Sequence, residues 1–84
     1  MLRLVPLQSN NLSGLAYDLV SGRLFVQFNN GTWYEYFDVP GDAVLSVLFD
    51  PVSQGKAFNT HIKEAGFVYT KVDENSVGLL DIHV

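Results

Sequence analysis

The sequence predicts an α+β fold, in which an antiparallel sheet carries two helices on one of its faces. Short segments of alternating apolar and polar residues, separated by turn residues, occupy residues 12–39. Two segments with helical periodicity follow between residues 40 and 65, and residues 67–72 return to a strand pattern. We therefore expect an antiparallel β-meander of three central strands with N- and C-terminal edge strands, and two helices packed on one face.

Size and composition indicate a single soluble domain over residues 1–84. The chain is 48% hydrophobic and 17% charged, so it has enough apolar material to build a core. The lack of cysteine excludes disulfides, thiolate metal sites and thiol nucleophiles. A net charge of −4 argues against non-specific binding to duplex nucleic acid. No apolar run approaches the roughly 20 residues that span a bilayer, and no signal peptide opens the chain, so we expect a cytoplasmic protein without a membrane partner.

The N-terminal residues form an edge element. Residues 2–7 are apolar, but Pro6 has no N–H to donate to a ladder, which favours an edge strand or an extended arm. Residues 8–11, Gln-Ser-Asn-Asn, are typical of a turn.

The three central strands follow in order. The first covers residues 12–18, and the second covers residues 23–28, with Leu24, Val26 and Phe28 on one face. Asn30-Gly31 predicts a tight type I′ hairpin turn, because that turn needs positive φ at both central residues.

The third strand, predicted over residues 32–39, is rich in aromatic residues. Alternation places Tyr34 and Tyr36 on one face of the sheet and Trp33 and Phe37 on the other. Large rings on both faces indicate that both are covered at least in part. The helices cover one face, and the N-terminal arm, the C-terminal tail or a second subunit covers the other.

Two helices follow the sheet. Pro40 fits the first turn of a helix, and Asp50-Pro51 ends it. Its predicted apolar face consists of Val44, Leu45, Leu48 and Phe49.

Ser53 is a good N-cap for the second helix, predicted over residues 54–65. Gly66 is placed to end this helix in the left-handed conformation. The predicted buried stripe consists of Phe58, Ile62 and Ala65.

The chain closes with two further strand patterns. Residues 67–72 form a short strand pattern, and Leu80, Ile82 and Val84 alternate with polar residues as a weaker one.

These residues, in this order, resemble the KTSC domain family over about residues 5–69. The most specific part is Ser53-Gln54-Gly55, followed by Phe58-Asn59 and Ile62-Lys63. Further matching residues are Leu15-Ala16-Tyr17-Asp18, Leu24, Val26, Phe28, Gly31, Tyr34, Tyr36 and Val39-Pro40.

The resemblance implies a fold and a motif, but no reaction. The family is found free-standing in phages and bacteria and at the C-terminus of some lysyl-tRNA synthetases. Gln54 departs from the family, which usually has a basic residue there, and residues 73–84 form an extra C-terminal tail or strand outside the resemblance.

Catalytic chemistry has little support in the sequence. The only imidazoles are His61 and His83, with no nucleophile-elbow pattern and no metal-ligand spacing around them. Glu35 and Asp38, three positions apart on a strand, face opposite sides and cannot act as a carboxylate pair. We expect no enzyme, no metal and no cofactor.

Anion binding is chemically more coherent. The first N–H groups of the second helix and its dipole favour negative charge, and Gly55 would let a phosphate approach the backbone. Lys56, Asn59 and Lys63 recur at i, i+3 and i+7, roughly one helical stripe. The structural alternative stays open: Ser53 only caps, Gly55 only allows close packing, and Asn59 bonds a loop carbonyl.

The aromatic residues also have two interpretations. Tyr34 and Tyr36 either stack bases beside a lysine-bearing helix or fill the space between sheet and helix. Trp33 and Phe37 form an exposed apolar patch where the tail does not cover them, and such a patch marks an interface.

Two functions of different classes follow. The first is a non-enzymatic module that recognises a phosphate-bearing small ligand, a nucleotide or RNA, at the N-terminus of the second helix. The second is a protein–protein interaction module that uses the aromatic sheet face and the C-terminal tail. Such a module could be encoded by a phage, and its partner could be a second copy of the chain in a homo-oligomer.

Overall fold

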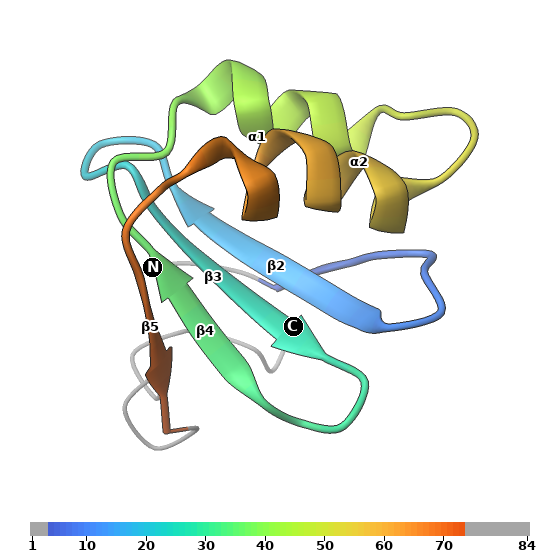
Figure 1. Ribbon diagram of the computed structural model, residues 1–84, viewed down its shortest axis with the longest axis horizontal. Helices are drawn as coiled ribbons and strands as arrows, with labels where there is room; N and C mark the ends of the chain where they lie inside the picture. The colour runs from blue at the N-terminus through green and yellow to red at the C-terminus, as the bar shows by residue number, and fades with distance from the viewer. Residues whose placement is uncertain (1–3, 74–84) are drawn as a thin grey trace.

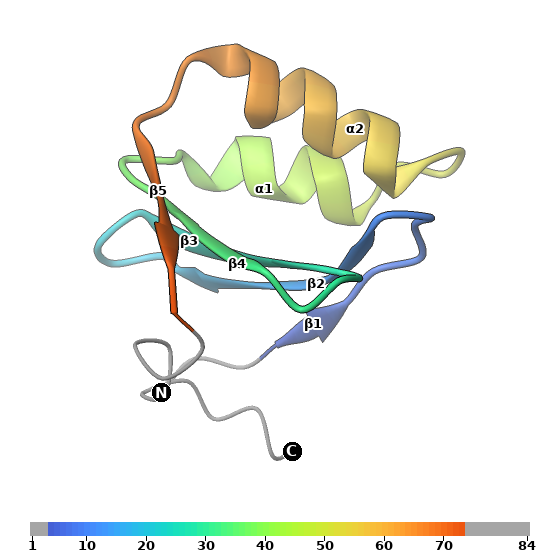
Figure 2. The same cartoon turned by 60° about the horizontal axis from the view of Figure 1, so that its bottom comes forward.

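A computed structural model describes residues 4–73 of the chain, and it has the predicted α+β architecture. Five antiparallel strands form one sheet in the order β1-β2-β3-β4-β5, and both helices lie on the same side of it (Figures 1 and 2). The strands are β1 (Val5–Pro6), β2 (Leu12–Asp18), β3 (Arg23–Phe28), β4 (Trp33–Tyr36) and β5 (Tyr69–Val72). The helices are α1 (Gly41–Leu48) and α2 (Gln54–His61), and the 3₁₀ turn η1 (Lys63–Ala65) follows α2.

Strand register decides which side chains face the helices. Val26 pairs with Tyr34 and Leu24 with Tyr36, so the apolar face of β3 and the two tyrosines of β4 share the helix side. On the other side of β4, Tyr36 pairs with Tyr69 and Tyr34 with Lys71. Directly opposite residues point to the same face, so β5 adds a tyrosine and a lysine to the helix side of the sheet.

The main core lies between the sheet and the helices. Phe58 and Ile62 of the α2 region are fully buried against β2, β3 and β4, with Val44 and Val47 of α1 beside them. The remaining buried members of this core are Leu7, Leu12, Leu15, Leu24, Val26, Tyr36, Val39 and Ala57.

The opposite face of the sheet holds a second, smaller cluster. Trp33 is only 1% exposed and packs with Ala16 and Phe25, and Leu4 of the N-terminal arm and Val72 of β5 border it. The expected exposed patch of Trp33 and Phe37 is therefore not present in this form: Trp33 is buried and Phe37 is half-buried. The Trp33 indole N–H has no hydrogen-bond partner among residues 4–73.

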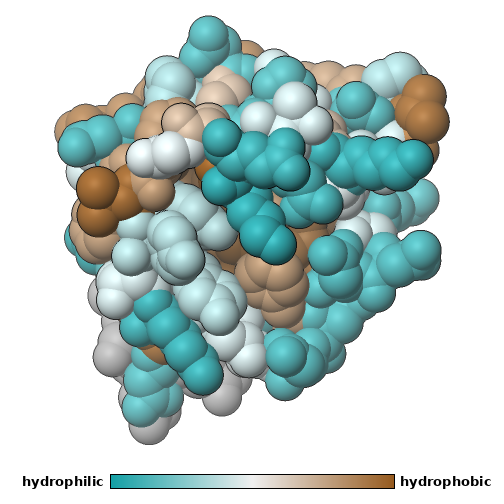
Figure 3. All heavy atoms as spheres, in the orientation of Figure 1, coloured by the Kyte–Doolittle hydropathy of each residue, from teal (hydrophilic) through white to brown (hydrophobic). Residues whose placement is uncertain are grey.

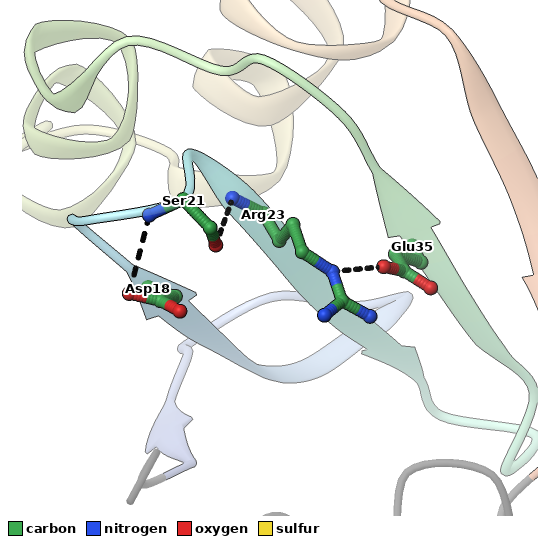
Figure 4. A network of polar contacts seen from close by, with 4 residues as sticks. All are labelled: Asp18, Ser21, Arg23 and Glu35. Carbon is green, nitrogen blue, oxygen red and sulfur yellow. Dashed lines mark hydrogen bonds and ion pairs between the residues drawn. The ribbon is translucent and has the colours of Figure 1, made fainter.

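Polar residues border this second cluster. The guanidinium of Arg23 donates to the buried Glu35 carboxylate on the next strand (Figure 4). Its central carbon also lies over the Phe25 ring, 5.2 Å from the ring centroid. Asp18 and Ser21 hold the β2–β3 turn through bonds to backbone N–H groups. Glu35 thus has a cationic partner on the face away from the helices.

The β3–β4 turn differs from the predicted type I′ turn. Gly31 has φ of 88°, but Asn30 is not in the left-handed region. The Gly31 N–H donates to the Phe28 carbonyl and the Phe28 N–H donates to the Thr32 carbonyl, which is the longer hairpin with a left-handed glycine at its end. The predicted turn type was wrong, because the observed turn needs positive φ at Gly31 only and not at Asn30.

Strands β4 and β5 are shorter than predicted. Asp38 has φ of 56°, and this left-handed residue takes the backbone out of the ladder after Tyr36 instead of at residue 39. The last predicted strand begins at Tyr69 instead of residue 67, although the Phe37 N–H still donates to the Val68 carbonyl.

The buried face of α1 is rotated from the predicted one. Val44 and Val47 are buried, whereas Leu45 is 52% and Phe49 76% exposed. Two overlapping apolar stripes satisfy the helical period, and periodicity cannot choose between them. Val39, just before the helix, is buried as well.

The second predicted helix is divided. α2 ends at His61, and Ile62 (φ −119°, ψ −62°) leads into the 3₁₀ turn η1. Ile62 remains buried, but Ala65 is exposed, since the tighter winding turns it away from the core. Gly66, with φ of 89°, ends the element in the left-handed conformation as predicted.

The predictions for the two ends of the chain have different outcomes, since the structure describes residues 4–73. β1 is a short edge strand paired with β2, as Pro6 indicated. The strand pattern of Leu80, Ile82 and Val84 lies outside residues 4–73. Within that range, no helix is long and apolar enough to cross a membrane.

Candidate functional site

Six of the predicted site residues line two separate hollows, one near each end of α2. The first, the N-cap hollow, has a volume of about 530 Å³ and is formed by the α2 N-terminus and the turn before β2. The second, the tyrosine pocket, has a volume of about 370 Å³. Ser53, Gly55 and Lys56 line the N-cap hollow, and Tyr34, Tyr36 and Lys63 line the tyrosine pocket.

Internal hydrogen bonds hold the start of α2, at and beside the N-cap hollow. The Ser53 hydroxyl accepts from the Lys56 backbone N–H at 3.1 Å, which is an N-cap bond. The Gln54 side chain donates to the Leu48 carbonyl at 3.0 Å and accepts from the Gln8 N–H at 2.7 Å. Gln54 thereby links the C-terminus of α1, the start of α2 and the N-terminal segment.

Gly55 lies against the 8–11 turn. A Cβ at this position would lie 2.8 Å from the Ser9 hydroxyl and 3.4 Å from the Asn11 carboxamide oxygen. The Ser9 hydroxyl itself bonds the Asn11 side chain and the N–H groups of Asn11 and Leu12. The glycine therefore allows the 8–11 turn to approach the helix. The space beside Gly55 is taken by Ser9 of the same chain and not left open for a phosphate.

Asp50 fixes the loop that leads into α2. Its carboxylate accepts from the Val52 and Ser53 N–H groups at 2.9 and 2.7 Å. These backbone hydrogen bonds hold the pKa of the Asp50 carboxyl below its usual value.

The tyrosine pocket has aromatic walls. The Tyr34 ring lies edge-on to Phe28 at 5.5 Å and to Tyr69 at 6.0 Å between ring centroids. Tyr36 lies 5.3 Å from Tyr69 at an interplanar angle of 31°, and it packs edge-on against Phe58 below. Tyr36 is 4% exposed and Tyr69 is 58% exposed, so the rings form a wall that rises from the core to the surface.

Three phenol hydroxyls of this pocket are available to a ligand. The hydroxyls of Tyr34, Tyr36 and Tyr69 make no hydrogen bond with residues 4–73, and Asn30 and Thr32 line the rim. Burial, with the neighbouring tyrosines, raises the pKa of Tyr36, which therefore keeps its proton as a donor at neutral pH.

Two lysines flank the tyrosines. Lys63, on η1, lines the pocket, and Lys71 lies directly across from Tyr34 on β5. Figure 3 shows this side of the molecule, where hydrophobic surface lies in a hollow with hydrophilic side chains above it and paler ones to its left. A planar apolar group and an anionic group can both find partners here.

The predicted stripe of Lys56, Asn59 and Lys63 is not a single surface. α2 ends before Lys63, and Lys56 and Lys63 line different hollows. Asn59 is half-buried on α2 between them and makes no hydrogen bond with the described residues, so it does not hold the loop carbonyl that the structural alternative assigned to it.

Sequence reasoning missed several residues of the tyrosine pocket. The missed residues are Phe28, Asn30, Thr32 and Tyr69, together with Lys71 at its edge. Alternation within residues 69–72 gave a signal for the last two, since Tyr69 and Lys71 share a face. Their position beside β4 depends on strand order, which alternation does not give.

The predicted absence of a metal site concerns the two histidines and the acidic residues. No group of three or more His, Cys, Asp or Glu residues there could hold a metal ion. His61 is exposed on α2, and His83 lies outside residues 4–73.

Comparisons with known proteins agree with this fold. The KTSC domain family model matches residues 8–67. A protein of Stutzerimonas stutzeri (strain A1501), named "Uncharacterized protein", is 36% identical over 69 residues, which are 82% of this chain and 96% of that protein. A crystal structure of a KTSC domain protein from Yersinia pestis superimposes with a TM-score of 0.75 at 26% identity, and covers 87% of this chain and 100% of that one.

Proposed function

The chain belongs to the KTSC domain family, and we propose that it is a non-enzymatic binding domain that takes a phosphate-bearing aromatic ligand, a nucleotide unit, in the tyrosine pocket. The observation that carries this proposal is the combination of closely packed tyrosine rings with a lysine at one hollow. The predicted ligand class is kept, but its place moves from the N-terminus of α2 to the other end of that helix.

The pocket's size and chemistry support a single nucleotide unit. A volume of about 370 Å³ lies at the low end of small-molecule sites. Tyr34 and Tyr69 offer ring surface for stacking with a base, and such stacking contributes about 1–3 kcal/mol per base. Lys63 and Lys71 supply positive charge for a phosphate in a protein whose net charge is −4.

The N-cap hollow is the weaker location for the same ligand. A bound phosphate there would compete with Ser53 for backbone N–H groups, and it would have to displace the Ser9 hydroxyl beside Gly55. These groups already have partners within the chain, which favours the structural interpretation of Ser53 and Gly55.

The same lining residues support a non-enzymatic role. The pocket offers phenol, amide, hydroxyl and ammonium groups, but among its lining residues there is no carboxylate, imidazole or thiol to act as a base near neutral pH. Binding is the chemistry that these residues support.

The protein-interaction alternative, through Trp33, Phe37 and the C-terminal tail, has less support. Trp33 is 1% exposed and belongs to the second apolar cluster, so its ring is not offered to a partner in this form. The tail lies outside residues 4–73.

Titration calorimetry with adenosine, guanosine, cytidine and uridine monophosphates, at low and at physiological salt, tests the proposal. We expect at least one monophosphate to bind, and to bind more tightly than both its nucleoside and inorganic phosphate, with affinity falling as salt rises. Lys63→Glu should weaken this binding at least about tenfold, because it replaces an attractive charge by a repulsive one.

Lys56→Glu is the matched control, with the same charge change on α2 instead of η1 and in the N-cap hollow. It should change affinity less than about twofold. If Lys56→Glu abolished binding and Lys63→Glu did not, the ligand would lie at the α2 N-terminus. A monophosphate panel without binding at millimolar concentration would reject a nucleotide ligand altogether.

A further inference from the structure

The outer side of α1 carries an unpartnered apolar stripe. Gly41, Leu45 and Phe49 recur every four residues and so lie along one side of the helix. A Cβ on Gly41 would lie 3.4 Å from the Leu19 methyl group, so Leu19 of the β2–β3 turn continues the stripe beyond the helix N-terminus. Leu45 is 52% exposed, and Leu19 and Phe49 are each 76% exposed.

Further apolar side chains extend this stripe at both ends. Val20, 96% exposed, follows Leu19, and Val52, 89% exposed, lies in the α1–α2 loop just past Phe49. Figure 3 shows hydrophobic surface at these two ends, over the β2–β3 turn on the left and the α1–α2 loop on the right. We call Leu19, Val20, Leu45, Phe49 and Val52 the α1 stripe.

We propose that the α1 stripe is the contact between two copies of this chain, which pair their α1 helices antiparallel about a two-fold axis near Leu45. This inference is independent of the proposed function, because the stripe shares no residue with the tyrosine pocket.

The shape of the stripe fits a second copy of itself. Leu45 is midway between Gly41 and Phe49, so a two-fold axis there places the large Phe49 ring of one copy beside the side-chain-free Gly41 and the Leu19 of the other. Antiparallel helices also oppose their dipoles favourably.

The exposed area is of the size that a modest dimer needs. At the observed exposures, the five side chains present on the order of 600 Å² of apolar surface per copy. A standard interface buries about 800 Å² per partner, so the stripe with its polar rim approaches that size. The stripe itself contains no charged residue to desolvate, and Asp42 and Ser46 lie beside it.

Charge predicts how salt acts on this dimer. Antiparallel pairing brings Asp42 of one copy towards Asp50 of the other, and each copy has a net charge of −4. Screening should therefore strengthen self-association, the opposite of its effect on nucleotide binding in the tyrosine pocket.

Sedimentation equilibrium of the full chain from about 10 µM to about 1 mM, at low and high salt, is the test. We expect the mass to rise from 9.4 kDa towards twice that value, with tighter association at high salt. Leu45→Asp and Phe49→Asp, both at exposed positions, should weaken association more than about 100-fold while the circular dichroism spectrum stays unchanged. Val68→Asp, at a 72% exposed position outside the stripe, should leave it unchanged.

Cysteine cross-linking tests the geometry, since the chain has no cysteine of its own. Leu45→Cys should oxidise readily to a covalent dimer, because the two copies of residue 45 meet at the axis. Val20→Cys, at the end of the stripe, should not. A wild-type mass of 9.4 kDa at about 1 mM in high salt would overturn the proposal. So would equal losses in Val68→Asp and Leu45→Asp, or equal cross-linking at residues 20 and 45.

Discussion

The N-cap hollow and the tyrosine pocket lie near opposite ends of α2, and their polar groups are used in opposite ways. At and beside the N-cap hollow, Ser53 of its lining and the neighbouring Gln54 and Asp50 all bond groups of the same chain. In the tyrosine pocket, three phenol hydroxyls have no partner among residues 4–73, and Lys63 lies beside them.

This difference shows that the most distinctive sequence motif need not form the binding site. Ser53-Gln54-Gly55 is the most specific part of the sequence, and its bonds connect the helices, the N-terminal segment and the turn before β2. The pocket with open polar atoms is formed mainly by less distinctive residues. A specific motif can therefore specify how elements join, while the binding surface forms elsewhere.

The largest expected effect is loss of the core residue that supports the rings of the tyrosine pocket. Phe58 is fully buried under α2 and lies edge-on to Phe28 and Tyr36 of the pocket, at 6.1 and 5.9 Å. Phe58→Ala should cost about 3–5 kcal/mol in the free energy of unfolding, which is most of the stability of a domain this size. Urea unfolding measures this loss. Phe49→Ala, at an exposed position, is the control and should cost under about 0.5 kcal/mol at low protein concentration.

A smaller effect distinguishes the two regions. Gly55→Ala places a Cβ 2.8 Å from the Ser9 hydroxyl, and moving Ser9 breaks its bonds in the turn before β2. We expect a loss of about 1–2 kcal/mol in the free energy of unfolding, with nucleotide affinity unchanged. Gly41→Ala, whose nearest contact is an ordinary 3.4 Å, should be neutral or stabilise by up to about 1 kcal/mol. A stable Gly55→Ala variant that lost nucleotide binding would return the site to the N-cap hollow.

The smallest effects are in the pH dependence of stability. The pKa is lowered for Asp50, beside the N-cap hollow, and raised for Tyr36 in the tyrosine pocket, so the two regions lose stability at opposite ends of the pH range. The lowered pKa of Asp50 adds stability above its unfolded pKa of about 3.9, and this is lost as pH falls through the lower folded pKa. The raised pKa of Tyr36 adds stability that is fully present below about pH 10 and lost as pH rises through the folded pKa.

Thermal unfolding from pH 2 to 11 measures both changes. The difference between wild type and Asp50→Asn should shrink at the acid end, and that between wild type and Tyr36→Phe at the alkaline end. Asp18 and Tyr17, whose pKa values shift in the same directions, contribute to the pH dependence of the wild type and of both variants alike. Identical pH profiles for wild type and Asp50→Asn would show that Asp50 does not fix the start of α2.

Much of the fold could be predicted from local pattern. Alternation in residues 12–18 and 23–28, the N-cap at Ser53 and the left-handed Gly66 each act over a few residues, and each is confirmed. The errors come where two local solutions are equally good. The β3–β4 turn needed one positive φ instead of two, and α1 had two overlapping apolar stripes.

The candidate site was predictable only in part. Tyr34, Tyr36 and Lys63 were identified from the sequence and meet in one pocket, whereas Lys56 was placed with them wrongly because the helix was expected to continue to residue 65. Tyr69 and Lys71 were missed, since β5 joins β4 across more than thirty residues of chain.

The sequence by itself determined the class of fold, the faces of the central strands and the caps of α2, because each depends on periodicity or on backbone groups within one turn. Tertiary structure alone decided which stripe of α1 is buried, that Trp33 is covered, and that the lysines of α2 and η1 serve different hollows. These outcomes depend on how elements far apart in the chain pack together, and that packing is set by the shape of the whole core.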